Sequence, residues 1–372
     1  MKAIAVFPGQ RDLQLVQHPE PELTGPTDVK IRMIEAGICG TDREIVSGQY
    51  GTPPGGGDYL IIGHESLGRV IEAGDAVTRV RPGDLVVPMV RRPCPHSHCL
   101  ACRAGRSDFC YTGDFTERGI KQRHGFMTEF VVDDEEYMSA VPENLRGIAV
   151  LAEPLTIAEK ALEQIWQVQS RLPWACPVVP GKAGAHCHTA VVLGAGPVGM
   201  LGALAFAAAG FRTVVYSRTP APNDRSALCD LFGAEYVSSE TTPPAGLSGA
   251  VGAIDVVFEA TGASRFAFEV MKHIGANAVF VLTGVPGRRA PAEIDTDLLM
   301  RNLVLSNQVV FGTVNAGRQS YEAAIRDLAT FQSRWPEAVS RLISGRYPME
   351  CHRDHLCGEA TGIKNVITLG GE

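Results

Sequence analysis

An excess of positive charge is absent from this 372-residue chain, which has 34 Lys and Arg against 41 Asp and Glu and a formal net charge of −7. Such a chain has no bulk attraction for nucleic acid or for an anionic membrane surface. We therefore expect no nucleic acid and no membrane among its partners, and a small-molecule substrate instead.

The chain also lacks an apolar leader and an unbroken apolar run of membrane-spanning length. Its opening, MKAIAVFPGQRDLQLV, becomes polar after Phe7, unlike a signal peptide. The longest uncharged run, 189–211, is interrupted by Pro197 and several glycines. We therefore predict a cytoplasmic protein without a transmembrane segment. In a reducing compartment, its ten cysteines are expected to be metal ligands or buried thiols and not disulfides.

The pattern of residues changes along the chain. Its 372 residues are more than a domain with one ordinary hydrophobic core needs. Residues 1–150 contain short apolar runs between glycines and prolines, which indicates short strands and turns. A helical pattern, LAEPLTIAEKALEQIWQV, follows from Leu151. From residue 189 apolar runs alternate with helical patterns, which is typical of βαβ units and a parallel sheet. The tail lacks this rhythm, so we expect it to return to the first domain.

A glycine-rich turn follows the apolar run AVVL and precedes an apolar helical pattern. Gly194 permits a tight turn, Gly196 lets backbone approach a pyrophosphate, and Gly199 lets helix and strand pack closely. This pattern predicts dinucleotide binding. The next strand, TVVYSR, ends on Ser217 and Arg218 where NAD binding would favour a carboxylate. A hydroxyl and a guanidinium favour the 2′-phosphate of NADP, although both could be solvated loop residues.

Four cysteines fall within the stretch CPHSHCLACRAGRSDFC. Four thiolates form a closed tetrahedral zinc site that stabilises a loop and leaves no position for substrate. The alternatives are reduced thiols without metal and a nucleic-acid-binding zinc ribbon. His96 or His98 could also replace one cysteine, because the first gap is wide. The predicted ligands of this structural zinc are Cys94, Cys99, Cys102 and Cys110.

A second, open metal site is indicated by Cys39 in GICGTD and by His64 and Glu65 in IIGHESLG. A thiolate, an imidazole and a carboxylate leave zinc a vacant position, where it can act as a Lewis acid on a substrate alcohol while hydride passes to nicotinamide. Glu153 is either a further ligand, directly or through water, or a carboxylate that favours a helix start. Thr41 could relay the hydroxyl proton or cap a helix.

With these motifs in this order, the chain resembles the zinc-dependent medium-chain dehydrogenases/reductases over essentially its whole length, most specifically in GHESLGRVIEAG. The resemblance implies an α/β fold: a mainly β, GroES-like catalytic domain and a Rossmann domain with a doubly wound parallel sheet. We assign residues 1–170 and 316–372 to the first, with the zinc lobe at about 91–112, and residues 171–315 to the second. It also implies a homodimer or homotetramer.

The stretches GDFTERGI, LAEPLTIAEKALE and NQVVFGTVNAG resemble the glucose 1-dehydrogenase branch of that family. By this resemblance Glu117 and Asn315 contact sugar hydroxyls, Glu153 lies near the metal, and Cys39, His64 and Glu65 hold zinc. The expected cofactor contacts are Gly194, Gly196, Pro197, Val198, Gly199, Ser217, Arg218, Thr261, Thr283 and Asn315.

The implied reaction is NADP-preferring oxidation of a sugar hydroxyl, at the anomeric carbon of an aldose such as glucose, to a lactone. Val90 and Leu305 stand where the branch tends to have polar sugar contacts, which keeps another polyol, a cyclitol or a secondary alcohol as the alternative. A non-catalytic NADP-binding protein is a further alternative. His124 either approaches the active site or lies at the surface, which is the expected position. Arg91 and Arg92 either steer an anionic substrate or pack the lobe.

Overall fold

The computed structural model describes residues 1–179, 183–287 and 291–370, and the chain divides into two compact units. The first unit comprises Met1–Thr156, Asn315–Ala329 and Leu342–Glu372. The second comprises Ile157–Val314 and Thr330–Arg341. Both chain ends therefore belong to the first unit, and the second is an insertion into it.

The first unit is built on a seven-stranded sheet with the order β11-β6-β5-β3-β19-β18, in which β10 also pairs with β3. Two three-stranded sheets, β2-β1-β4 and β7-β8-β9, complete it. In the long strand β3, alternate residues Val29, Ile31 and Met33 are fully buried, as expected for a strand with one face on the core. The strands are β1 (Lys2–Phe7), β2 (Asp12–Gln17), β3 (Asp28–Gly37), β4 (Leu60–Ile61), β5 (Glu65–Ala73), β6 (Leu85–Pro88), β7 (Arg91–Arg92), β8 (Thr116–Arg118), β9 (Gln122–Arg123), β10 (Phe130–Asp134), β11 (Met138–Val141), β18 (Ile343–Pro348) and β19 (Lys364–Thr368).

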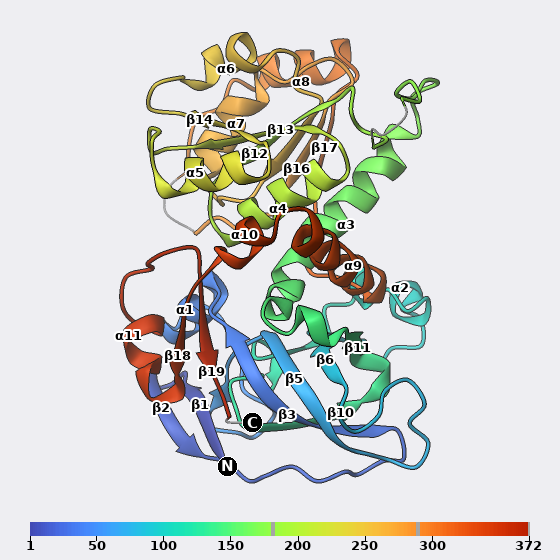
Figure 1. Cartoon of the computed structure of the whole chain (residues 1–372), viewed down its shortest axis with the longest axis vertical. Helices are drawn as coiled ribbons and strands as arrows, with labels where there is room; N and C mark the ends of the chain where they lie inside the picture. The colour runs from blue at the N-terminus through green and yellow to red at the C-terminus, as the bar shows by residue number, and fades with distance from the viewer. Residues whose placement is uncertain (180–182, 288–290, 371–372) are drawn as a thin grey trace. The chain divides into compact units, whose positions relative to one another are not determined.

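The helices of the first unit are short, apart from two that continue into the second unit. The short ones are α1 (Gly40–Val46), α2 (Leu100–Arg103), α11 (His352–Leu356) and the 3₁₀ turns η1 (Ser107–Phe109), η2 (Glu135–Tyr137), η3 (Glu143–Leu145), η4 (Ala149–Leu151) and η5 (Met349–Cys351). The shared ones are α3 (Ala152–Gln169) and α9 (Arg318–Arg334). Figure 1 labels most of these elements.

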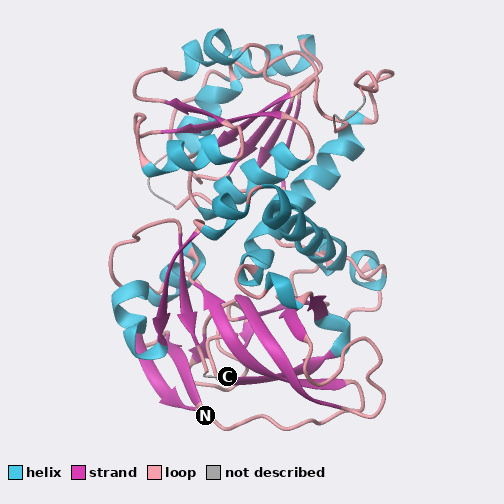
Figure 2. Ribbon diagram, viewed as in Figure 1, coloured by secondary structure: helices cyan, strands magenta, loops and turns pink. Residues whose placement is uncertain are grey.

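The second unit contains one parallel six-stranded sheet in the order β14-β13-β12-β15-β16-β17. Counted from β12 this is the Rossmann order 3-2-1-4-5-6. Figure 2 shows helices on both faces of this sheet, which explains why its strands are almost entirely apolar. Its elements are β12 (Thr189–Leu193), α4 (Pro197–Ala208), β13 (Arg212–Ser217), α5 (Asp224–Leu231), β14 (Glu235–Ser238), α6 (Pro244–Val251), β15 (Val256–Glu259), α7 (Ser264–Met271), β16 (Val279–Leu282), α8 (Thr296–Leu305), β17 (Val309–Gly312) and α10 (Pro336–Ser340).

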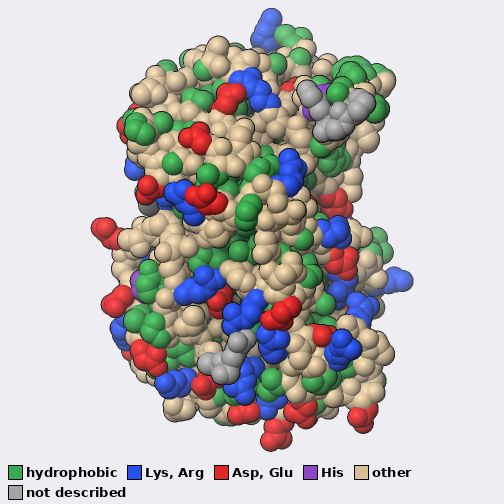
Figure 3. All heavy atoms as spheres, in the orientation of Figure 1, with side chains coloured by type: hydrophobic (Ala, Val, Ile, Leu, Met, Phe, Trp, Pro, Cys, Tyr) green, Lys and Arg blue, Asp and Glu red, His purple; other side chains and the backbone are tan. Residues whose placement is uncertain are grey.

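The α/β fold class expected from the sequence is confirmed by these two architectures. The division at residue 156 falls inside the continuous helix α3, so no change of sequence pattern marks it. Domain limits at residues 170 and 315 remain a prediction from the sequence. Among the described residues, no helix is both long and apolar enough to cross a bilayer. On the face drawn in Figure 3, positive and negative side chains are interspersed.

Candidate active site

Cys39, His64 and Glu65 come together in the first unit, and their potential ligand atoms all lie within 4.8 Å of one another. Strand pairing explains why, because the last residue of β3, Gly37, pairs with Glu65 at the start of β5. Cys39 lies two residues after the end of β3 and is the N-cap of helix α1. A β-carbon at Gly37 would lie 2.2 Å from Oε2 of Glu65, so the carboxylate occupies space that only glycine leaves free.

Asp42, which is completely buried, organises two members of this group. Its carboxylate accepts a hydrogen bond from the backbone N–H of Cys39 (2.8 Å), and its Oδ1 lies 3.4 Å from Nδ1 of His64. Burial alone would lower the pKa of His64, but Asp42 and Cys39 raise it well above its usual value. A carboxylate behind a histidine is the usual outer partner of a metal-bound imidazole. The donor set and its surroundings therefore fit a zinc ion.

Lys364 contacts Glu65, the third member of the group. Sequence reasoning missed this lysine. Its Nζ lies 2.7 and 2.5 Å from the two carboxylate oxygens of Glu65 and donates to the carbonyl of Ile38 at 3.1 Å. Burial would lower the pKa of Lys364, yet Glu65 and Cys39 raise it, so the ammonium stays charged. A lysine at the start of strand β19, whose other residues are uncharged, was the available signal. This pair fixes the orientation of the Glu65 carboxylate.

Glu153 and Thr41 lie near this group and are both half-buried. Burial raises the pKa of Glu153 to about 7, an effect that His64 opposes and the charge of Glu65 reinforces. Its carboxyl group can therefore hold or release a proton near neutrality. Helix α1 begins at Gly40 with Cys39 as its N-cap, so the alternative that Thr41 caps this helix is wrong.

A buried polar cluster joins the two residues expected to contact sugar. Arg91 donates to Oε1 of Glu117 from Nε (3.0 Å) and Nη2 (2.9 Å), and the Asn315 side-chain amide donates to the same oxygen at 2.7 Å. Arg91 also stacks on Phe115, with its guanidinium carbon 3.7 Å from the ring centroid. The guanidinium of Arg91 therefore binds Glu117. This contact favours the alternative in which Arg91 packs the lobe over the one in which it steers an anionic substrate. Tyr50, which sequence reasoning overlooked, is half exposed. Its hydroxyl interacts electrostatically with Glu117 and Arg91.

A second buried ion cluster supports the first. Asp133, in β10, accepts hydrogen bonds from Arg92 and, at 2.6 and 2.8 Å, from Arg118. Arg123 lies 3.5 Å from the same carboxylate. Burial would raise the pKa of Asp133, but Arg118 and Arg92 hold it well below its usual range. Because Arg92 and Arg118 neighbour Arg91 and Glu117 in strands β7 and β8, Asp133 anchors the strands that present the polar cluster.

His124 is half-buried, so only part of its side chain lies at the expected surface position. Its Nδ1 accepts a hydrogen bond from the backbone N–H of Ile61 at 3.1 Å, and its ring stacks on Tyr59 with centroids 5.4 Å apart. His18 makes an edge contact at 5.0 Å. His124 is therefore a packing residue of the first unit.

The buried position of His124 predicts a dependence of stability on pH. Burial, with the charges of His18 and Arg118, lowers its pKa to about 4. The folded state therefore resists protonation, so its stabilising contribution is complete above the unfolded pKa of about 6.5 and is lost as pH falls toward 4. We expect a loss of about 1–2 kcal/mol after allowing for solvent screening. Urea unfolding between these pH values should show it, and His124→Asn should flatten the profile; parallel profiles would contradict the assignment.

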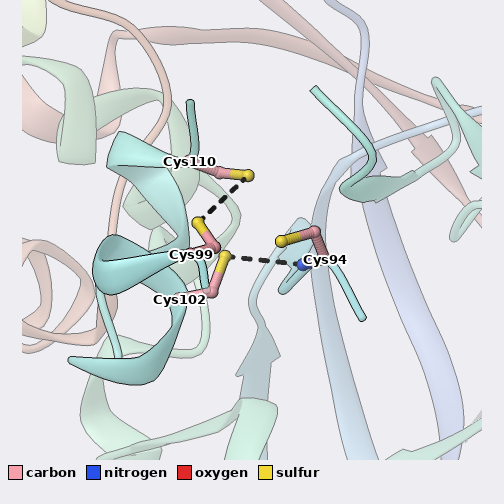
Figure 4. Close-up of side chains that lie close together, drawn as sticks. All are labelled: Cys94, Cys99, Cys102 and Cys110. Atoms are coloured by element: carbon pink, nitrogen blue, oxygen red, sulfur yellow. Dashed lines mark hydrogen bonds between the residues drawn. The ribbon is translucent and has the colours of Figure 1, made fainter. Parts of the chain in front are cut away.

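The four cysteines between residues 94 and 110 also form a group whose sulfur atoms lie within 4.8 Å of one another. Figure 4 shows their side chains converging from α2, from the turn before it and from the segments on either side. His96 instead pairs with Asp114, and His98 packs on His96 at a centroid distance of 5.2 Å. Neither histidine belongs to the group, so four sulfurs are the available donors, as a closed structural zinc site requires. The ligands brought together are Cys94, Cys99, Cys102 and Cys110.

Cys102→Ser should remove about one of about two zinc ions per chain and lower thermal stability. The remaining sulfurs cannot complete a tetrahedral sulfur site, whereas Cys39, His64 and Glu65 are untouched. Metal analysis and a thermal melt measure the two effects, with Cys229→Ser as the matched control in a buried position outside the group. Unchanged metal content would contradict the assignment.

In the second unit, the glycine turn has the geometry that dinucleotide binding requires. Gly194 has a φ of +102°, and a β-carbon there would lie 2.7 Å from Thr261. A β-carbon on Gly199 would lie 2.1 Å from the carbonyl oxygen of Gly194, so helix α4 can approach β12 only with glycine here. Gly196 is the N-cap of α4, Pro197 and Val198 form its first turn, and nothing lies within 4 Å of a β-carbon on Gly196. The helix N-terminus is therefore open to a pyrophosphate.

Ser217 ends β13 and Arg218 follows it with an exposed side chain. Arg225 lies in the first turn of α5, and its Nε donates to the carbonyl of Ala195 within the glycine turn at 2.9 Å. Sequence reasoning did not identify this contact. The guanidinium of Arg225 thus ties α5 to the turn.

Glu259, at the end of β15, was also missed. Its carboxylate accepts hydrogen bonds from the backbone N–H groups of Thr261 (2.6 Å) and Gly284 (3.1 Å), and its backbone carbonyl accepts one from the hydroxyl of Thr283 (2.6 Å). The hydroxyl of Thr261 donates to the same carboxylate at 2.5 Å. Thr261 and Thr283 therefore lie together at the carboxyl edge of the sheet, where such folds bind their ligands. The side-chain amide of Asn315, which is expected to contact cofactor as well as sugar, donates to Glu117.

Comparison with known proteins shows the family to which the chain belongs. Residues 146–369 match the family described as the glucose dehydrogenase C-terminus, and residues 25–143 match the alcohol dehydrogenase GroES-like domain. Glucose 1-dehydrogenase of Methanocella arvoryzae is 38% identical over 370 residues, which cover 100% of both chains. The chain belongs to the glucose dehydrogenase branch of the medium-chain dehydrogenases/reductases.

Further members of this branch show the same full-length agreement. Glucose 1-dehydrogenase 2 of Saccharolobus solfataricus is 34% identical over 350 residues, covering 92% of each chain. A solved structure of Haloferax mediterranei glucose dehydrogenase in complex with NADP, Zn and gluconolactone is 30% identical, covers 100% of both chains and has a TM-score of 0.88. Membership in this branch makes the chain an oxidoreductase that acts on an alcohol group, which confirms the expected enzyme class.

The expectation that the cysteines form no disulfide is wrong for two of them. Cys176 and Cys187 are joined by a disulfide in the second unit. The expectation was based on the predicted compartment, whereas the disulfide joins two cysteines that both precede β12. His188 follows directly, with Nδ1 3.6 Å from Oδ1 of Asp255.

Proposed function

We propose that this enzyme oxidises the anomeric hydroxyl of an aldose such as glucose to the lactone, with zinc at Cys39, His64 and Glu65 and with NADP preferred over NAD. The observation that carries the proposal is the grouping of these three ligands within 4.8 Å in the same unit as the Glu117 and Asn315 pair. The names of the relatives, and the NADP, Zn and gluconolactone in the Haloferax mediterranei complex, support the same reaction.

Zinc supplies a Lewis acid for the substrate oxygen, and NADP supplies the hydride acceptor. The chain's own residues position and deprotonate the substrate. Asp42 orients His64, and Lys364 orients Glu65. The carboxyl of Glu153, with a pKa of about 7, is suited to accept the hydroxyl proton. Thr41, half-buried two residues after Cys39, is proposed as the relay that brings the proton there.

The sugar is proposed to meet Glu117 and Asn315 through its hydroxyl groups. The carboxylate of Glu117 is fixed by Arg91, so it presents acceptor lone pairs in one orientation. Asn315 has a φ of +59°, which points to a tightly fixed turn at this position. Tyr50 offers a half-exposed ring beside this pair as an apolar surface for a sugar ring.

A substrate panel tests the proposal. Purified enzyme is incubated with NADP and with aldoses, cyclitols, polyols or simple secondary alcohols while NADPH absorbance is followed. Turnover of glucose or a related aldose supports it. Val90 and Leu305 have side chains without hydrogen-bonding atoms, so neither can provide a polar side-chain contact to a sugar. If only a polyol, cyclitol or secondary alcohol reacts, the alternative that these two residues favour replaces the aldose. Cofactor binding without any turnover would favour the non-catalytic alternative.

Arg218→Ala should raise the KM for NADP by about tenfold and leave the KM for NAD nearly unchanged. The guanidinium is proposed to form charge-assisted hydrogen bonds with the 2′-phosphate, which NAD lacks. Initial rates at saturating sugar measure both constants, and Arg341→Ala, also an exposed arginine of the second unit, is the matched control. An unchanged ratio of the two constants would refute the role of Arg218.

A further inference from the structure

The part of the chain that the structure describes contains a third group of candidate metal ligands, which the proposed reaction does not use. It lies in the second unit and consists of Cys176, Cys187 and His188, whose potential ligand atoms all lie within 4.8 Å of one another. The two cysteines are joined by a disulfide in this structure. The group therefore places an imidazole beside two sulfur atoms that reduction would convert to thiols.

The separation of the two cysteines suits a metal ion as well as a disulfide. A tetrahedral zinc ion with Zn–S bonds of about 2.3 Å holds two sulfurs about 3.8 Å apart. The α-carbons of Cys176 and Cys187 are 5.8 Å apart, so rotation of the two side chains after reduction can provide that distance. The backbone of His188 is fixed independently of the disulfide, because its N–H donates to Ala185 at 2.9 Å and its carbonyl accepts from Arg212 at 3.0 Å.

A carboxylate lies beside this imidazole, which is the usual outer partner of a metal-bound histidine. Oδ1 of Asp255 is 3.6 Å from Nδ1 of His188, and its Oδ2 accepts a hydrogen bond from the backbone N–H of Thr189 at 2.7 Å. The side chains of His188 and Asp255 are 26% and 28% exposed, Cys176 is half-buried and Cys187 is exposed. An ion from solvent can therefore reach all three candidate ligands.

A cavity of about 490 Å³ in the second unit borders the same group. Cys176, His188 and Asp255 line it together with the aromatic side chains of Trp166 and Phe211. Three protein donors leave a tetrahedral zinc ion with one vacant position, which water fills in sites of this kind. The cavity offers an ion a path to the group and room for that water.

We propose that reduction of the Cys176–Cys187 disulfide converts this group into a zinc site. The ligands are the two cysteines and His188, and Asp255 orients the imidazole. An external dithiol supplies two electrons and two protons, the S–S bond breaks, and the dithiol is oxidised to its own disulfide. Zinc then displaces the two thiol protons as two Zn–S bonds form. Because a sulfur in a disulfide is not a thiolate, oxidation of the pair releases the metal.

A cobalt titration of the full, zinc-loaded enzyme tests this proposal. One sample is oxidised with diamide, and the other is reduced with a phosphine that is removed anaerobically before Co²⁺ is added. The reduced enzyme should bind about one further Co²⁺ per chain, with thiolate-to-cobalt charge-transfer absorption, and the oxidised enzyme should bind none. Zinc remains in the other two groups because such ligands prefer Zn²⁺ to Co²⁺, and bound zinc is measured on the same samples.

His188→Gln leaves the disulfide intact and should weaken binding of the further Co²⁺ to the reduced enzyme by at least about 100-fold. Cys187→Ser should abolish the charge-transfer absorption. The matched controls are His186→Gln, from the same segment, and Cys357→Ser, an exposed cysteine outside the three groups, and both should bind Co²⁺ as the unaltered chain does. No further Co²⁺ in the reduced enzyme, equal binding by the oxidised enzyme, or undiminished binding in His188→Gln would each overturn the proposal.

Discussion

His64→Gln is expected to lower kcat/KM for the sugar by at least about 100-fold while leaving the affinity for NADP intact. Loss of even an outer partner of a metal ligand typically costs 10- to 100-fold, and His64 is a proposed ligand itself. The imidazole is held against the buried carboxylate of Asp42 at 3.4 Å, and a glutamine amide cannot reproduce its nitrogen donor. The proposed NADP contacts at the glycine turn and at Arg218 lie in the second unit, so they should not change.

The measurement for this variant combines initial rates, cofactor titration and metal content. His186→Gln is the control, because that histidine lies in the second unit and contacts the carbonyl of Ala183. We expect the control to retain activity and the His64 variant to lose about one zinc per chain. Normal turnover together with normal metal content in His64→Gln would show that this imidazole is not a ligand.

Asp133→Asn is expected to lower the free energy of unfolding by about 3–5 kcal/mol. The carboxylate is 4% exposed and holds Arg92 and Arg118, both buried, so its neutral replacement leaves positive charges without compensation. That loss is a large fraction of the 5–15 kcal/mol by which ordinary domains are stable. We also expect a raised KM for the sugar, because β7 and β8 carry Arg91 and Glu117.

Urea unfolding measures the first effect, and initial rates under stabilising conditions measure the second. Asp75→Asn, at an exposed position, is the control and should change stability by less than about 0.5 kcal/mol. Asp133→Glu keeps the charge and should be the milder substitution. A loss below about 1 kcal/mol in Asp133→Asn would show that the three arginines do not depend on this carboxylate.

Features that depend on local sequence were predictable. The glycine turn could be located because Gly194, Gly196 and Gly199 each meet a local steric need, which the structure shows as a positive φ, an open N-cap and a close strand contact. The four-cysteine group could be proposed because its members lie within 17 residues of one another. Cys39, His64 and Glu65 could be grouped by the donor atoms that they offer and by the family resemblance, but the strand pairing that joins them could not be predicted.

Features that depend on long-range contact were not predictable. Lys364 meets Glu65 across 299 residues, through the antiparallel pairing of β19 with β3. Arg318 reaches Met138 across 180 residues, and Arg91 meets Glu117 only because β7 and β8 pair. Periodicity predicts that such residues lie in strands or helices, but it contains no information about which elements become neighbours. Charged side chains in strands were the remaining signal, and Lys364, the one charged residue of β19, gave it.

We propose that sugar oxidation depends on a zinc ion held by Cys39, His64 and Glu65. The most direct measurement is a stepwise removal of metal with a chelator, with zinc content and glucose-dependent NADP reduction recorded on the same samples. We predict that activity falls in proportion to loss of one zinc ion per chain and returns when zinc is added back. Full activity in protein shown to contain no metal would contradict the account.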